Sequence, residues 1–133
     1  MKKLIVSPSL LACDYLNMGE ELKTVEQSGS EYAHVDIMDG IFVPNISFGI
    51  PLVEQLRKGT ELVLDVHLMI DRPARYVERF CQSGADIVTI HAEADTVENN
   101  SIALEMIKDA GVRPGLSIKP NTPAEAVIPY LDL

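Results

Sequence analysis

The sequence predicts an α/β fold in which parallel strands alternate with helices. Short β-rich runs alternate with amphipathic stretches, and the connections between them are only a few residues long. A weak repeat supports this pattern, because Gly29, Gly84 and Gly111 each stand at an expected helix end just before an expected strand. Strict alternation with short connections is typical of parallel strands joined by helical crossovers.

Five strands are expected. The first is a short β-rich run at residues 4–7, which Pro8 interrupts. The second surrounds His34, where the side chains alternate between the two faces of a strand. The other three are expected at 62–68, 86–91 and 112–118.

Five helices are expected to follow these strands. Asp14 or Asn17 is expected to cap the first helix, which ends at Gly29. Proline stands near the first turn of two others, at Pro73 and Pro123, where its missing N–H removes no helical hydrogen bond. The remaining two helices are expected at about 51–57 and 97–109.

Five such units are too few for a complete eight-unit barrel. That fold typically needs ~250 residues, and the chain has 133. An open sheet would leave its first and last strands unpaired at hydrophobic edges. The expected architecture is therefore one partial (β/α) barrel domain over residues 1–133. It would be either a fragment or a half-barrel that closes by pairing with another chain as a homo-oligomer.

Charge and composition restrict the classes of partner. A net charge of −9 and a pI near 4.6 argue against nucleic acid or an anionic membrane as partners. A small anionic substrate remains compatible, because backbone amides at a helix N-terminus can bind a phosphate locally. No apolar run is long enough to span a bilayer or to resemble a signal peptide. Cys13 and Cys81 fit no metal or redox spacing, which favours the cytoplasm.

The candidate active site lies at the ends of two strands. His34, Asp36 and Met38 share one face of their strand, while His67 and Met69 share a face of the next. Two imidazoles and a carboxylate can therefore converge on one point. Less specific interpretations exist for each residue type. A single His-x-Asp is more often structural, methionines more often fill a core, and Ser9 fits a simple strand-end hydroxyl.

Three further polar residues stand at strand ends. Asp65 shares the parity of His67, and we expect it to orient a neighbouring group. His91 and Glu93 receive no functional role, and we expect them to form a pocket wall or a satisfied polar pair. Asp39 is expected to stabilise the turn after its strand.

Three motifs together resemble the ribulose-phosphate 3-epimerase family. The resemblance is in register over all 133 residues and matches the N-terminal portion of the family, about five of its eight β/α units. The motifs are Ser7-Pro8-Ser9-Leu10-Leu11-Ala12-Cys13-Asp14, His34-Val35-Asp36-Ile37-Met38-Asp39-Gly40 with Phe42-Val43-Pro44-Asn45, and Asp65-Val66-His67-Leu68-Met69.

This resemblance implies a (β/α)8 TIM barrel of the ribulose-phosphate-binding type that epimerises D-ribulose 5-phosphate to D-xylulose 5-phosphate in the pentose phosphate pathway. It implies that His34, Asp36 and His67 bind one divalent metal ion, and that Asp36 is also one of two catalytic carboxylates. It implies that Ser9, His67, Met38 and Met69 contact the sugar phosphate. The family's second catalytic Asp and its phosphate-binding loops match no segment up to residue 133.

The chemistry explains why these residue types are needed. Epimerisation at C3 of a ketose removes a proton beside a ketone and returns one from the opposite face, so a carboxylate is needed on each face. The enediolate between these steps carries negative charge that a cation can stabilise. Imidazoles with a carboxylate suit Zn²⁺, Fe²⁺, Mn²⁺ or Co²⁺.

Three alternatives to this activity remain open at the level of sequence. One is D-allulose-6-phosphate 3-epimerase, because that relative shares the motifs. Another is a catalytically inactive half-barrel fragment that assembles through its open sheet edges. The third is a different phosphate-binding barrel, such as an aldolase or synthase, although neither would need both histidine-bearing strands.

Overall fold

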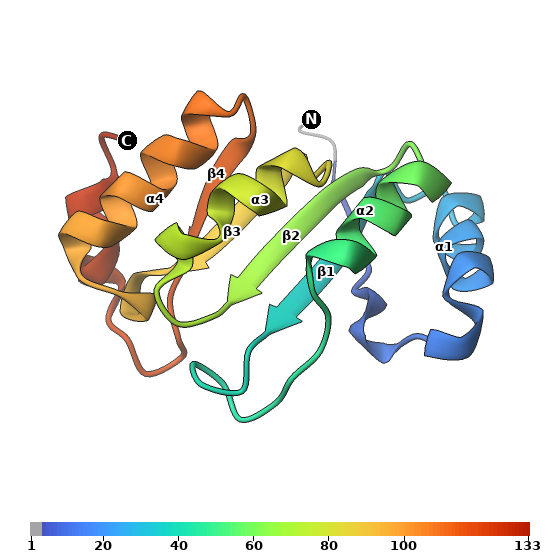
Figure 1. Ribbon diagram of the computed structural model, residues 1–133, viewed down its shortest axis with the longest axis horizontal. Coiled ribbons are helices and arrows are strands. Elements are labelled where there is room, and N and C mark those ends of the chain that lie inside the picture. The colour runs from blue at the N-terminus through green and yellow to red at the C-terminus, as the bar shows by residue number, and fades with distance from the viewer. Residues whose placement is uncertain (1–3) are drawn as a thin grey trace.

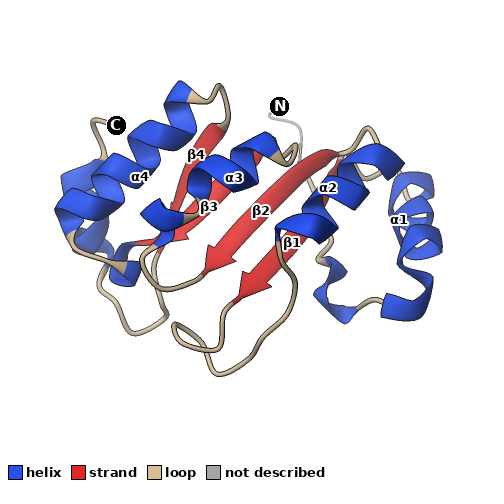
Figure 2. Ribbon diagram, viewed as in Figure 1, coloured by secondary structure: helices blue, strands red, loops and turns tan. Residues whose placement is uncertain are grey.

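The computed structural model describes residues 4–133 and contains one parallel sheet with helices on one face (Figure 1). Figure 2 shows the helices that follow the strands lying together in front of the sheet. The strands are β1 (Tyr32–Met38), β2 (Val63–Met69), β3 (Ile87–His91) and β4 (Arg113–Ser117), and they pair in sequence order.

The α-helices alternate with these strands, as the sequence predicts. Short 3-10 helices stand at several of the connections. The α-helices are α1 (Met18–Gln27), α2 (Ile50–Gly59), α3 (Val77–Gln82) and α4 (Val97–Asp109), and the 3-10 helices are η1 (Leu10–Ala12), η2 (Tyr15–Asn17), η3 (Pro73–Arg75), η4 (Ala92–Ala94) and η5 (Ala124–Tyr130).

Strand order and direction indicate a barrel-type arrangement. All three strand pairings are parallel, and the order β1-β2-β3-β4 contains no reversal. A doubly wound sheet would reverse its order at a switch point, whereas successive neighbours are typical of a (β/α) barrel. In barrels of this kind, functional residues gather at the carboxyl ends of the strands.

The two faces of the sheet differ in chemistry. In β2, buried residues alternate with half-buried ones, so that Leu64, Val66 and Leu68 face the helices. Asp65 and His67 have the opposite parity and lie on the other face. The apolar core therefore lies between sheet and helices, and the polar side chains remain available on the other face.

The first predicted strand is wrong. Residues 4–8 have no regular structure, and Leu4 is 86% exposed. Pro8 lacks an N–H for a strand ladder, although its carbonyl accepts a 2.8 Å hydrogen bond from the His34 N–H. Ser9 forms an isolated parallel bridge with His34. This segment therefore lies beside β1 without completing a fifth strand.

The last predicted helix also differs from expectation. Residues 124–130 form the 3-10 helix η5, with Pro129 inside it. A proline removes the N–H that an α-helical turn would need and clashes with the preceding turn. The other helix and strand ranges agree with the predicted ones to within a few residues, except that η3 precedes α3.

Candidate metal centre

Strand register brings the predicted site residues together. In the parallel pairing of β1 with β2, His34 lies opposite Asp65 and Asp36 lies opposite His67. All four residues have the parity that places them on the face away from the helices. The sequence predicts which face of its strand each side chain occupies. The register of β1 against β2 then determines which of these side chains meet.

His34, Asp36 and His67 form a compact group. Asp36 Oδ1 lies 3.2 Å from Nε2 of His34 and 2.9 Å from Nδ1 of His67. The two imidazole rings have centroids 5.5 Å apart. One possible ligand atom from each residue lies within 4.8 Å of the others. This group of two imidazoles and one carboxylate could hold a metal ion.

The surroundings of His34 suit a metal ligand. Its Nδ1 lies 2.7 Å from Asp65 Oδ2, and that carboxylate oxygen also accepts a 3.2 Å hydrogen bond from Ser7 Oγ. With an ion bound, a neutral His34 that donates its Nδ1 proton to Asp65 would offer its Nε2 lone pair to that ion. This contact places Asp65 against His34, and the orienting role expected of Asp65 stays a prediction.

Asp36 is an ionised carboxylate. Burial opposes ionisation, but hydrogen bonds from His34, His67 and Ser9 outweigh it and hold the pKa of Asp36 well below its usual range. Ser9 Oγ donates to Asp36 Oδ2 over 2.6 Å. Asp36 and Asp65 in turn raise the pKa of His34 to about 9 in the metal-free protein.

Met38 and Met69 lie beside each other at the carboxyl ends of β1 and β2. They are register partners, and both are half-buried. The adjoining turn is held by Asp39, whose carboxylate accepts hydrogen bonds from the N–H groups of Ile41, Phe42 and Asp71. The turn-stabilising role predicted for Asp39 is therefore confirmed.

The sequence interpretation missed the contact between His91 and His67. Their Nε2 atoms lie 2.8 Å apart, and the rings stack with centroids 5.0 Å apart. His91 Nδ1 lies 3.3 Å from Glu93 Oε2, which confirms the predicted polar pair. Burial and the neighbouring His67 lower the pKa of His91. The signal available in the sequence was that His91, like His67, stands near the carboxyl end of its strand.

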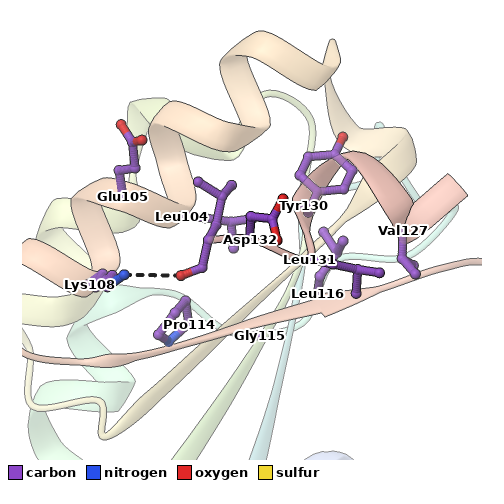
Figure 3. A pocket seen from close by; sticks show the side chains of 11 residues that line it. Leu104, Glu105, Lys108, Pro114, Gly115, Leu116, Val127, Tyr130, Leu131 and Asp132 are labelled. Carbon is purple, nitrogen blue, oxygen red and sulfur yellow. Dashed lines mark hydrogen bonds between the residues drawn. The ribbon is translucent and has the colours of Figure 1, made fainter.

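An apolar pocket lies away from this centre. It is lined mainly by residues of α4, β4 and η5, including Leu104, Leu116 and Tyr130, and has a volume of about 470 Å³ (Figure 3). Lys108 Nζ donates a 3.1 Å hydrogen bond to the Leu133 carbonyl at its edge. It contains none of the predicted site residues, so the polar group at the strand ends remains the candidate for chemistry.

The fold and the polar cluster define a (β/α) barrel protein with a candidate metal centre at the carboxyl ends of its strands. A family model described as "Ribulose-phosphate 3 epimerase family" matches residues 5–132 of the chain. The chain therefore belongs to this family, whose fold is the TIM barrel. This confirms both the resemblance and the fold class expected from the sequence.

Several relatives are similar to the chain along most of its length. Ribulose-phosphate 3-epimerase from Synechocystis is 42% identical over 99% of the chain and 59% of the relative. The enzyme of that name from Bacillus subtilis is 45% identical over 92% of the chain and 55% of the relative. The chain thus spans a little over half the length of these relatives.

A solved structure supports the fold alone. It is 3-keto-L-gulonate-6-phosphate decarboxylase from Vibrio cholerae, with a TM-score of 0.74 and 14% identity. The match covers 98% of the chain and 59% of the decarboxylase.

Proposed function

We propose that this chain carries the metal-binding and one acid/base part of a ketose-phosphate 3-epimerase. The proposed reaction interconverts D-ribulose 5-phosphate and D-xylulose 5-phosphate. The observation that supports it is the convergence of His34, Asp36 and His67 at adjacent strand ends. Membership of the epimerase family agrees with this chemistry.

We propose that Nε2 of His34, Nδ1 of His67 and a carboxylate oxygen of Asp36 bind one divalent ion. Zn²⁺, Fe²⁺, Mn²⁺ and Co²⁺ all suit this donor set. When bound, such an ion supplies Lewis-acid stabilisation of the negative charge that develops on the ketose oxygens. The donor atoms support this proposal because they already face one another around Asp36.

Asp36 is the proposed acid/base residue on one face of the sugar. Its ionised carboxylate is the form that accepts a proton, and its position among two imidazoles and the Ser9 hydroxyl limits its rotation. In this role it takes the C3 proton from one epimer and returns a proton to C3 in the reverse direction.

Ser9, His67, Met38 and Met69 are the proposed substrate contacts. The Ser9 hydroxyl lies at the same carboxylate, within reach of a group bound there. The two methionines present polarisable thioether surface without an acidic proton, which suits a surface beside an electron-rich intermediate.

We further propose that residues 1–133 form one domain that works in the cytoplasm as part of a homo-oligomer, without nucleic acid. The acidic net charge supports the absence of nucleic acid. Between Leu4 and Leu133, no helix has the length and apolar character required to cross a membrane. The outer edge of β4 has no strand partner within the described residues, which supports self-association.

The direct test is exchange of the C3 proton of D-ribulose 5-phosphate in D₂O, followed by proton NMR with Zn²⁺ added. We expect deuterium at C3 and formation of D-xylulose 5-phosphate. Stoichiometric metal without C3 exchange would instead identify a non-catalytic module. Faster exchange with D-allulose 6-phosphate would identify the hexulose phosphate as the substrate.

A further inference from the structure

His91 is a buried imidazole that the proposed reaction does not use. It is 7% exposed and ends β3. Its ring lies between two others, with centroid distances of 5.0 Å to His67 and 5.0 Å to Phe42. These neighbours restrict rotation of the ring, so its two nitrogens keep distinct partners.

The two imidazoles must share one proton between their facing nitrogens. At 2.8 Å, Nε2 of His67 and Nε2 of His91 form a hydrogen bond only if one donates and the other accepts. A neutral imidazole carries its proton on one nitrogen and a lone pair on the other. The partner of the remaining nitrogen of each ring therefore decides the direction of this bond.

Glu93 determines the direction of this hydrogen bond from the side of His91. Its Oε2 lies 3.3 Å from Nδ1 of His91, and its Oε1 accepts a 2.6 Å hydrogen bond from the backbone N–H of Lys119. An ionised carboxylate only accepts, so the proton of His91 belongs on Nδ1. The lone pair of His91 then faces His67, which must donate from Nε2. An ion bound between His67 and Asp36 would replace their 2.9 Å hydrogen bond, and Nδ1 of His67 would then need no proton.

We propose that His91 and Glu93 are positioning residues that fix the proton of His67 on Nε2 and so keep its Nδ1 available as a metal ligand. The inference rests on the metal site proposed above. Asp65 does the same for His34 through one direct contact of 2.7 Å. Each proposed histidine ligand is therefore linked by hydrogen bonds to a carboxylate. His34 contacts Asp65 directly, and His67 reaches Glu93 through the ring of His91.

Three substitutions separate this role from simple packing. His91→Leu removes the acceptor. His91→Gln keeps an amide oxygen that can accept from His67. Glu93→Gln keeps the shape but replaces one acceptor oxygen with an NH₂ group, which leaves two donors facing each other at Lys119 or at His91. Ser83→Ala is the control, because Ser83 is buried and hydrogen-bonded to the Phe80 carbonyl without contacting the cluster.

The first measurement is the dissociation constant for Co²⁺, read from its visible absorption during titration of the metal-free chain. Loss of such a contact typically weakens metal binding ~10–100-fold, and we expect this for His91→Leu and Glu93→Gln. We expect His91→Gln to recover most of the affinity, and Ser83→Ala to match the wild type. Unchanged Co²⁺ affinity in both His91→Leu and Glu93→Gln would overturn the inference.

The second measurement locates the protons directly. Long-range ¹H–¹⁵N NMR distinguishes protonated from unprotonated ring nitrogens, and we expect N–H at Nδ1 of His91 and at Nε2 of His67. This result is expected in the Zn²⁺-loaded protein, in which the ion takes the place of the proton between His67 and Asp36. A proton on Nε2 of His91 would overturn the inference. Wild-type protein that binds no Co²⁺ would refute the metal site instead. A proton on Nδ1 of His91 would still support a hydrogen bond that runs from His67 to His91.

Discussion

At the scale of single residues, Asp36 is the point at which the site converges. One of its oxygens faces both imidazoles and the other accepts from Ser9. No other described carboxylate contacts three side chains of the proposed site. Substitutions that change only the carboxylate oxygens of Asp36 therefore give the clearest information on mechanism.

Asp36→Asn is expected to abolish C3 proton exchange while leaving the fold intact. The amide has the same shape but cannot act as a base, and loss of general acid–base catalysis typically costs at least ~10²–10⁴-fold in rate. Exchange into D₂O measures the effect, and far-UV circular dichroism checks the fold. Near-normal turnover would remove Asp36 from the mechanism.

His67→Ala is expected to lower metal occupancy, because it removes one of three candidate donor atoms. Elemental analysis after loading with Zn²⁺ and desalting measures the bound metal. Met69→Leu is the control, since Met69 lies at the end of the same strand but outside the His34–Asp36–His67 group, and the exchange conserves volume. Equal occupancy in His67→Ala and wild type would contradict the ligand role of His67.

The stability of the metal-free protein is expected to fall as pH rises from about 6.5 to about 9. The pKa of His34 is raised from its usual 6.5 to about 9, because Asp36 and Asp65 stabilise the imidazolium. Its ion pairs therefore stabilise the fold fully below the unfolded-state pKa and are lost as pH rises through the folded-state pKa.

Urea denaturation in the presence of a chelator, repeated at several pH values, measures this dependence. His34→Gln is the matched variant, and its free energy of unfolding should fall less over this pH range. An equal decline in both proteins would assign the pH dependence to other groups.

At the scale of the elements, Gly84 connects α3 to β3 in a conformation that only glycine adopts easily. Its φ is 101°, and a Cβ there would overlap the side chain of Arg57. Arg57 in turn pairs with Asp86 over 2.9 Å and donates to the Leu62 carbonyl. A side chain at position 84 would disturb the start of β3.

Gly84→Ala is expected to lower the free energy of unfolding by ~1–3 kcal/mol through overpacking and backbone strain. Gly19→Ala is the control, because Gly19 lies in α1 with open space around it. That change is expected to raise stability by ~0.5–1 kcal/mol through helix propensity. Urea denaturation of both variants checks the pair, and equal effects would contradict the explanation.

At the scale of the described residues as a whole, 4–133, the sheet has an unpaired edge at β4. This strand pairs with β3 on one side, and within residues 4–133 it has no strand on the other. The apolar pocket formed with α4 and η5 lies beside that edge (Figure 3). An unpaired strand with adjacent apolar surface favours association.

We expect the chain to self-associate in solution, as measured by sedimentation velocity over a range of concentrations. Leu131→Glu should weaken association, because Leu131 lines the pocket and is 72% exposed. Leu16→Glu is the control, since Leu16 is 94% exposed and lies in η2, directly before α1, which is on the opposite side of the molecule from β4 (Figure 1). A monomer at every concentration, or equal effects of the two substitutions, would contradict this prediction.

The sequence by itself determined the order of most elements and the face on which each site residue lies. Side-chain parity follows from local backbone geometry, so His34 with Asp36, and Asp65 with His67, could be assigned within their strands. The first strand could not be assigned correctly, because Pro8 and the missing partner strand, rather than local β propensity, decide the structure of residues 4–8.

Only the tertiary structure decided how the strands meet. The pairing of Asp36 with His67 depends on the register of β1 against β2, which is fixed by packing of the buried face. The contact between His67 and His91 depends in addition on ring orientations set by neighbours from three segments. Such contacts join residues 24 to 31 positions apart. No local pattern encodes them, because they exist only once the core has packed.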